Sequence, residues 1–462
     1  MRDASGEFGG LENVPKMAIT MGVGTIMKAK KVILMAWGEK KGSIIAKTLE
    51  SPISDQCPAT FLQRHHNCEF VIDEAAASEL TRTKKPWLVC NDIKWTKQLI
   101  KKAVINLCFE VKKPILKLTS KDYIDHGLIN LVKQYETANK VNIEVFNQVQ
   151  HTITGWPGGK PNVDDLTRPE RNSPFPKTTL VFSPHPDDDV LHMGGTLARL
   201  VEQGNNVHVV YQTTGNIAVT DDYVIQELDL CINFATLMNI DAAKLEELKE
   251  LRQLFVIRQP GEVHSQDILQ YKTSVLESES RAACRFLKIP EENIHFLRMP
   301  FYETGMIQKK SLSNEDIESV VKIMREVKPH QIFAAGDLVD PHGTHYLCLE
   351  AIVRALNIVD QDDWFKDCYI WLYRGAQYEW ELEKIDMAVQ LSPSELDIKN
   401  KAIYRHGSQC NFPAFPGEFR QNAEKRNRNN AVLYDKLGMA EYEAIEAFAR
   451  YHFKHGDYLI KP

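Results

Sequence analysis

Strand-like and helix-like segments alternate along the chain from residue 177 to its end. Short apolar runs are separated by longer amphipathic stretches such as GGTLARLVEQG, NEDIESVVKIMREVK and THYLCLEAIVRALN. This alternation is typical of a parallel sheet that helices cover on both faces. We therefore predict an α/β, Rossmann-like domain at 177–462. Its strands are expected in TTLVFS, NVHVVYQTT, NIHFLRMP, HQIFAAG and CYIWLYRG.

Two regions precede this domain, and a length of 462 residues fits two or three domains. Residues 1–150 also have α/β character, because strand-like KKVILMAWG leads into helix-like KKGSIIAKTLES. In the same region CEFVIDEAAASELTR has the pattern of a strand that runs into a helix. Residues 151–176 are rich in Pro, Gly and Asn and lack hydrophobic periodicity, so we predict an extended linker there.

Composition narrows the class of protein. A formal net charge of -6 argues against nucleic acid or an anionic membrane as the main partner. The nine cysteines form no C-x-x-C pair, which favours reduced thiols over a disulfide framework. The first residues do not resemble a signal peptide, and no stretch approaches the roughly 20 apolar residues of a membrane span. We expect a cytoplasmic protein, and a homo-oligomer stays open.

The segment SPHPDDD, directly after the first predicted strand of the second domain, crowds ionisable side chains into one turn. Pro184 and Pro186 restrict the backbone on either side of His185. His185 and Asp188 are three residues apart, so a turn can direct both side chains to one point. A divalent cation there would relieve the repulsion between carboxylates, and this ligand pair suits zinc among other metals. Asp187 would then lie beside the ion, free to accept a proton from water.

A third ligand is expected in DLVDPHGTHYLCLEA, which follows the predicted strand HQIFAAG. His342 and His345 lie three residues apart at the start of a helix, so both imidazoles share one face. In parallel sheets, ligands bind at the carboxyl ends of strands, and both motifs fall at such ends. We predict that His345 completes a His-Asp-His metal site and that His342 stabilises a developing oxyanion.

Each motif alone also has a simpler interpretation. The HPDD run could cap a helix N-terminus, and a lone HxxH pair is usually solvated or packed. Their joint occurrence at two strand ends favours the metal site. His208 and His295 fall inside strand patterns and are expected in the core or on the surface, and His192 stays ambiguous.

At these residues the chain resembles the PIG-L / LmbE family of zinc-dependent N-acetylglucosamine-type deacetylases. SPHPDDDVLHMGGTLARL is similar to the first family motif and DPHGTH to the second, with further similarity in ESRAACRFL, LYRGAQYEW and KAIYRHGSQ. The resemblance implies that His185, Asp188 and His345 bind Zn²⁺, that Asp187 is the general base, and that His342 stabilises the tetrahedral intermediate. It also implies an N-acetyl amino sugar as the substrate. Asp189 replaces the more usual Glu, and Gly343 and Thr344 replace the usual Pro-Asp.

The first region resembles a different family, the C-terminal part of glucosamine-6-phosphate deaminases. The similar stretch runs from ENVPKMAITMGVGTIMKAKKVILMAWG through CEFVIDEAAASEL. The resemblance implies that Lys41 contacts a sugar phosphate. The family's Gly-x-Gly-x-Asp-Gly-His stretch is not found in the chain, so we expect a truncated deaminase-like segment. Alternatives to deacetylation are therefore a deaminase/isomerase role on hexosamine phosphates, or a first segment that serves only in association.

Overall fold

The chain forms two compact units in the computed structural model. The structure describes residues 15–17, 19–90, 92–163, 168–258, 265–305, 309–337, 343–375, 379–410 and 418–459, with backbone alone at 418–420. One unit comprises the chain up to Val149 together with Lys436–Gly438. The other comprises Gln150–Asp435 and Met439–Leu459.

The first unit contains a small parallel sheet followed by helices. Strands β1 (Val32–Ala36) and β2 (Cys68–Ile72) pair in parallel, with helix α2 (Gly42–Glu50) between them in sequence. The helix predicted directly after β2 is wrong, because residues 73–80 form turns. There the Asp73 carboxylate accepts from the amides of Ala76 and Gly38, which stabilises a turn. The later helices are α3 (Thr81–Lys84), α4 (Lys97–Val111), α5 (Ser120–Asp125), α6 (Ile129–Tyr135) and α7 (Ala138–Thr152).

A mostly parallel eight-stranded sheet forms the centre of the second unit, so the predicted α/β class is confirmed. The strand order is β3-β9-β10-β8-β7-β4-β5-β6. Among these strands β10 alone runs antiparallel to its neighbours, and the other pairings are parallel, as expected for a Rossmann-like sheet. The strands are β3 (Ile153–Thr154), β4 (Thr178–Ser183), β5 (Asn206–Tyr211), β6 (Ile294–Phe296), β7 (Gln331–Ala335), β8 (Tyr369–Tyr373), β9 (Met387–Leu391) and β10 (Ala444–Tyr451).

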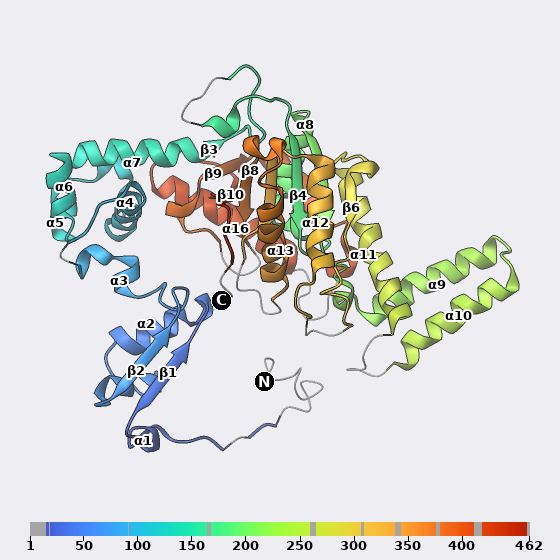
Figure 1. Cartoon of the computed structure of the whole chain (residues 1–462), viewed down its shortest axis with the longest axis horizontal. Helices are drawn as coiled ribbons and strands as arrows, with labels where there is room; N and C mark the ends of the chain where they lie inside the picture. The colour runs from blue at the N-terminus through green and yellow to red at the C-terminus, as the bar shows by residue number, and fades with distance from the viewer. Residues whose placement is uncertain are drawn as a thin grey trace. The chain divides into compact units, whose positions relative to one another are not determined.

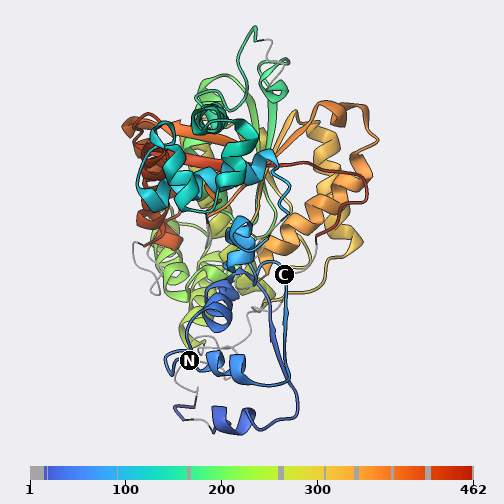
Figure 2. The same cartoon turned by 90° about the vertical axis from the view of Figure 1, so that its left-hand side faces the viewer.

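Helices cover both faces of this sheet, as the buried apolar character of its central strands requires. One apolar core joins the sheet to α8 (Asp188–Glu202), α11 (Gln266–Phe286), α14 (Pro393–Ile403) and α16 (Glu418–Lys436). The other core joins the opposite face to α12 (Asn314–Val327) and α13 (Thr344–Val359). Figures 1 and 2 show α12 and α13 on one side of the sheet and α16 on the other. Every central strand therefore ends between two helical layers.

Residues 151–176, predicted as a linker, fall in the second unit. Ile153 and Thr154 pair with β9 as the short edge strand β3. Farther along, the Lys177 ammonium group donates to the carbonyl of Pro174 at 2.8 Å. The segment thus carries specific contacts within this unit.

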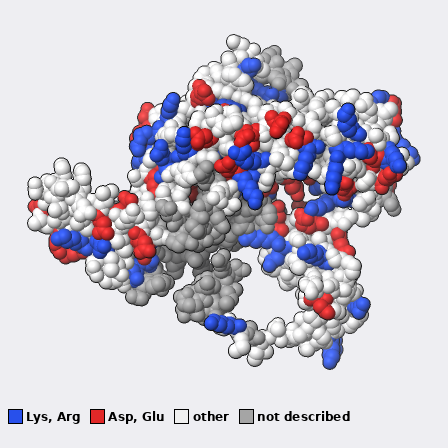
Figure 3. All heavy atoms as spheres, turned by 180° about the vertical axis from the view of Figure 1, so that it is seen from behind, with Lys and Arg blue, Asp and Glu red and all other residues white. Residues whose placement is uncertain are grey.

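A helical hairpin is inserted between β5 and α11. It consists of α9 (Asp221–Leu237) and α10 (Ala242–Ile257), and Figure 1 shows the two helices lying side by side. In the view from behind, basic and acidic side chains are interspersed over the described surface of the second unit (Figure 3). Among the helices described here, none combines the length and the apolar character that crossing a bilayer would require.

Candidate metal centre

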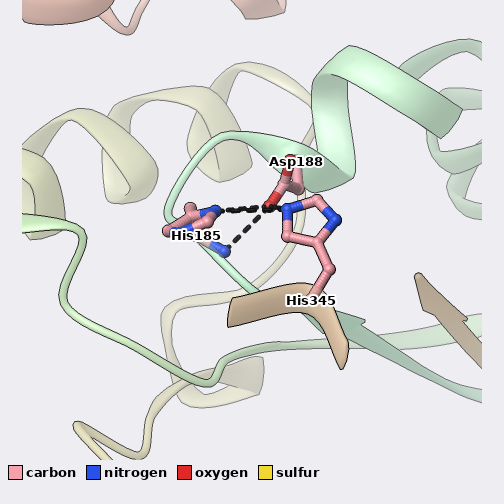
Figure 4. A group of neighbouring side chains, drawn as sticks. All are labelled: His185, Asp188 and His345. Carbon is pink, nitrogen blue, oxygen red and sulfur yellow. Dashed lines mark hydrogen bonds and ion pairs between the residues drawn. The ribbon is translucent and has the colours of Figure 1, made fainter. Parts of the chain in front are cut away.

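The two predicted motifs meet at the carboxyl ends of neighbouring strands. Strands β4 and β7 pair in parallel, so their carboxyl ends lie at the same edge of the sheet. The turn after β4 supplies His185 and Asp188, the first residue of α8. The first turn of α13, the next helix described after β7, supplies His345. Figure 4 shows the three side chains converging on one point.

The ligand atoms of these residues form a nearly equilateral triangle. Asp188 Oδ2 lies 3.1 Å from His185 Nδ1 and 3.2 Å from His345 Nε2. The two imidazole nitrogens are 3.3 Å apart. Two corners of a tetrahedron around a zinc ion, with bonds of about 2.0 Å, lie about 3.3 Å apart. Two nitrogens and one carboxylate oxygen at this spacing fit a divalent metal ion with one or more positions left open.

Hydrogen bonds between side chains and the backbone hold the turn that carries His185. The Ser183 hydroxyl donates to the His185 carbonyl at 2.6 Å, and the Thr213 hydroxyl donates to the Pro184 carbonyl at 2.6 Å. The amide of His185 donates to Asp188 Oδ2 at 2.9 Å. The turn is therefore fixed by its own sequence and by the loop after β5.

The three consecutive aspartates occupy three different environments. Burial raises the pKa of Asp189 to about 7, and its carboxylate accepts from the Tyr211 hydroxyl at 3.1 Å, inside the core. Burial alone would raise the pKa of Asp188, but His345 and the hydrogen bonds from His185 and the other imidazoles around it lower that pKa well below its usual value. Of the three aspartates, Asp188 is therefore the one whose surroundings favour the ionised carboxylate, and it is the one that belongs to the candidate metal site.

Asp187 differs from both neighbours. It occupies the N-cap position of α8 and is half-buried. Burial, with the carboxylates of Asp188 and Asp189 close by, raises its pKa well above the ordinary value. Carboxyl groups whose pKa is raised by their surroundings are typical of acid–base catalysis.

A small pocket opens beside Asp187. Residues of α14 and of α15 (Gly407–Cys410) form part of its lining. Glu279 on α11 holds this region by accepting from the amide and the hydroxyl of Ser408, each at 2.7 Å. The pocket is lined by Asp187, Val190, Leu191, Ile403, His406, Gln409 and Cys410.

Two further residues near the triangle were not predicted from sequence. His192 Nε2 lies 3.2 Å from Asp188 Oδ1, the carboxylate oxygen that is not part of the triangle. Asp337, two residues after β7, places a carboxylate oxygen 3.8 Å from His345 Nδ1, and its pKa is lowered by His345 despite burial. His192 stands within the first motif and could have been found there, whereas Asp337 carries no local signal beyond its strand end.

The remaining predicted residues lie elsewhere. His342, the predicted oxyanion-stabilising residue, falls outside the described residues. Lys41, the predicted phosphate contact, is exposed at the end of a 3-10 turn directly before α2 in the first unit. His208 and His295 stack on neighbouring strands with ring nitrogens 3.0 Å apart.

Comparisons with known proteins agree with the two resemblances. The PIG-L family model, described as GlcNAc-PI de-N-acetylase, matches residues 180–356. A glucosamine-6-phosphate deaminase-like protein of Bacteroides thetaiotaomicron is 50% identical over 457 residues, which cover 97% of this chain and 69% of that protein.

The chain is also similar to a deaminase over a short stretch and, at low sequence identity, to a solved deacetylase. The glucosamine-6-phosphate deaminase of Exiguobacterium sibiricum is 51% identical over 78 residues, so the match spans 17% of this chain and only 31% of that deaminase. The solved N,N'-diacetylchitobiose deacetylase of Pyrococcus horikoshii is 20% identical, covers 62% of this chain and 87% of its own, and gives a TM-score of 0.39.

Proposed function

Because the chain belongs to the family of the Bacteroides glucosamine-6-phosphate deaminase-like protein and carries a PIG-L deacetylase domain, we propose that it is a metal-dependent hydrolase that removes the acetyl group from an N-acetyl amino sugar. The observation that carries this proposal is the triangle of His185, Asp188 and His345, with edges of 3.1 to 3.3 Å. The choice of an N-acetyl amino sugar as the substrate is supported by the match to the PIG-L family model.

Zinc is the metal that we propose for this site. Two imidazoles and one carboxylate are a ligand set typical of catalytic zinc, which keeps an open position for water or substrate. A bound zinc ion would supply a Lewis acid that lowers the pKa of water and polarises the acetyl carbonyl. The protein's part is to hold the three ligand atoms at this spacing.

Asp187 is the proposed general base. Its carboxylate adjoins the ligand triangle without belonging to it, and burial beside other carboxylates raises its pKa well above the ordinary value. Asp187 would take a proton from the attacking water and return it to the nitrogen that leaves. We assign to His342 the role of stabilising the oxyanion, as the family motif implies. Acetate and a free amino sugar would result.

A second candidate function is the deamination of glucosamine 6-phosphate. The matches to glucosamine-6-phosphate deaminases favour it, with Lys41 as the phosphate contact. This reaction releases ammonia and needs no metal, so one assay separates it from deacetylation. Ammonia formed from glucosamine 6-phosphate, and lost on substitution of Lys41 by Ala, would support it.

The decisive experiment measures metal content and acetate release together. The purified full chain, loaded with zinc, is incubated with a panel of N-acetyl amino sugars, both free and phosphorylated. We expect about one zinc ion per chain and acetate from at least one substrate. His345→Ala should lose both, whereas His208→Ala, which removes a histidine of the same unit outside the triangle, should keep both. Acetate release that persists in His345→Ala would contradict the proposal.

A further inference from the structure

Arg426, on helix α16, reaches the metal ligands through a single histidine. Its Nη2 atom lies 3.2 Å from His192 Nδ1, and His192 Nε2 lies 3.2 Å from Asp188 Oδ1. We propose that Arg426 is a positioning residue that selects the tautomer of His192 and thereby fixes the Asp188 carboxylate for metal binding. The inference deepens the proposed function and rests on it for the identity of the metal site.

Hydrogen-bond chemistry leaves one arrangement for this chain of contacts. A guanidinium group can only donate, so Nδ1 of His192 has to accept and carries no proton. In a neutral imidazole the proton then sits on Nε2, which donates to Asp188 Oδ1. The opposite tautomer would set two donors against each other at Arg426 and two acceptors against each other at Asp188.

The two carboxylate oxygens of Asp188 therefore have different partners. Oδ1 is held by His192, whereas Oδ2 faces His185 Nδ1 and His345 Nε2. A carboxylate that is held by one oxygen cannot rotate freely, so its other oxygen stays directed at the ion. Partners that orient metal ligands in this way typically change metal affinity by about 10- to 100-fold.

The surroundings of the contact are shaped for it. Gly375, two residues after β8, leaves the space in which the guanidinium meets the imidazole. A Cβ atom at Gly375 would lie 2.6 Å from His192 Nδ1 and 2.9 Å from Arg426 Cζ, and the φ of +150° is one that L side chains rarely adopt. The ring of Tyr373 stacks on His192 at 5.5 Å between centroids, and the Gly375 carbonyl accepts from Arg426 Nη1. These contacts fix the plane of the imidazole and the place of the guanidinium.

The test is a double-mutant cycle on zinc affinity, measured by competition with a chromophoric chelator in the full chain. Arg426→Met should weaken zinc binding by about 10- to 100-fold. His192→Leu should weaken it by a similar factor, because Asp188 Oδ1 loses its donor. If Arg426 acts through His192, the double variant should be no weaker than His192→Leu alone. Factors that multiply in the double variant would overturn the proposal.

A matched control and a direct readout accompany the cycle. Arg428→Met removes an exposed arginine two residues away, which pairs with Glu424 and Glu443, and should leave zinc affinity unchanged. In metal-free protein labelled with ¹⁵N-histidine, NMR should show the Nε2–H tautomer for His192, and an Nδ1–H tautomer would overturn the proposal. If Arg426→Met does not fold, Gly375→Ala, whose Cβ atom would crowd both groups, should give the same loss of zinc affinity.

The outcomes separate this inference from the proposed function. A wild-type chain that binds zinc and releases acetate, with Arg426→Met unaffected in both readouts, would overturn the inference alone. Zinc binding that follows the expected cycle without acetate release would overturn the hydrolase and leave the role of Arg426 standing. A wild-type chain that binds no zinc would overturn both.

Discussion

Asp187 is the residue on which turnover should depend without metal binding being affected. Asparagine has the same shape as Asp but cannot take up the proton of an attacking water. We expect Asp187→Asn to lower acetate release by about 10²- to 10⁴-fold, the usual contribution of a general base. Its zinc content should equal that of the wild type, because the ligand atoms belong to other residues. Full activity in this variant, or loss of zinc, would remove Asp187 from the assigned role.

His406 should make the stability of the second unit depend on pH. The side chain is 1% exposed, and neither ring nitrogen has a hydrogen-bond partner among the described residues. Burial lowers its pKa to about 4, against about 6.5 in an unfolded chain. Between these values the unfolded chain binds a proton that the folded one excludes, so stability falls as pH decreases from about 6.5 to 4, by roughly 3 kcal/mol in all.

The variant His406→Leu tests this dependence because leucine does not titrate. Unfolding midpoints in urea at pH 7 and at pH 4.5 should lie closer together in the variant than in the wild type. An equal gap in both proteins would show that the pKa of His406 is the same in the folded and the unfolded chain.

At the level of single residues, sequence is informative where chemistry and spacing coincide. His185, Asp188 and His345 were predicted because they are metal-ligating types at strand ends, and the structure brings them within 3.3 Å of one another. Arg426 could not be predicted, because its contact with His192 spans 234 residues. Its own segment, EKRNRNN, has the pattern of a solvated helix.

Helix α8 is broken just after the residues that face the metal site. Met193 has φ -138° and ψ 24°, so the helix restarts there. The amides freed at Gly195 and Thr196 donate to the Glu446 carboxylate of β10 at 3.1 and 2.7 Å. Lys399 of α14 donates to the same carboxylate at 2.6 Å, and both charged side chains are fully buried. A buried ion pair therefore caps the second half of the helix.

Breaking this ion pair from one side should be costly. We expect Glu446→Gln to lower the free energy of unfolding by about 3 to 5 kcal/mol, because the Lys399 charge would stay buried without a counter-charge. Combining Glu446→Gln with Lys399→Met should recover much of that loss. Urea unfolding of the two single variants and the double variant can measure this. A double variant as unstable as the sum of the single losses would show that the two groups contribute independently.

At the level of elements, the apolar runs predicted the strands from β8 to β6 in the sheet order but not β3, β9 and β10 on the other side of the sheet. The five predicted segments correspond to β4, β5, β6, β7 and β8, each of which is an apolar run followed by a helix or a turn. Strand β10 carries the buried Glu446, which interrupts its apolar pattern. Strand direction is not encoded in hydrophobic periodicity, so the antiparallel β10 could not be read from the sequence.

For the whole molecule, zinc should act as a stabilising ligand. An ion that binds the folded chain alone adds about 2.7 kcal/mol to stability at a concentration 100 times its Kd. We expect the melting temperature of the wild type to rise with added zinc and to fall with a chelator, measured by differential scanning fluorimetry. His345→Ala should show no such shift. An equal shift in that variant would place the ion at a site other than the predicted triangle.

The metal ligands come from parts of the chain that are far apart in sequence, since 160 residues separate His185 from His345. The triangle exists only when β4 and β7 have paired side by side. A nascent chain synthesised only as far as β5 would contain two of the three ligands and should bind the ion weakly. Metal binding can therefore report, in one measurement, that the central strands of the sheet have paired correctly.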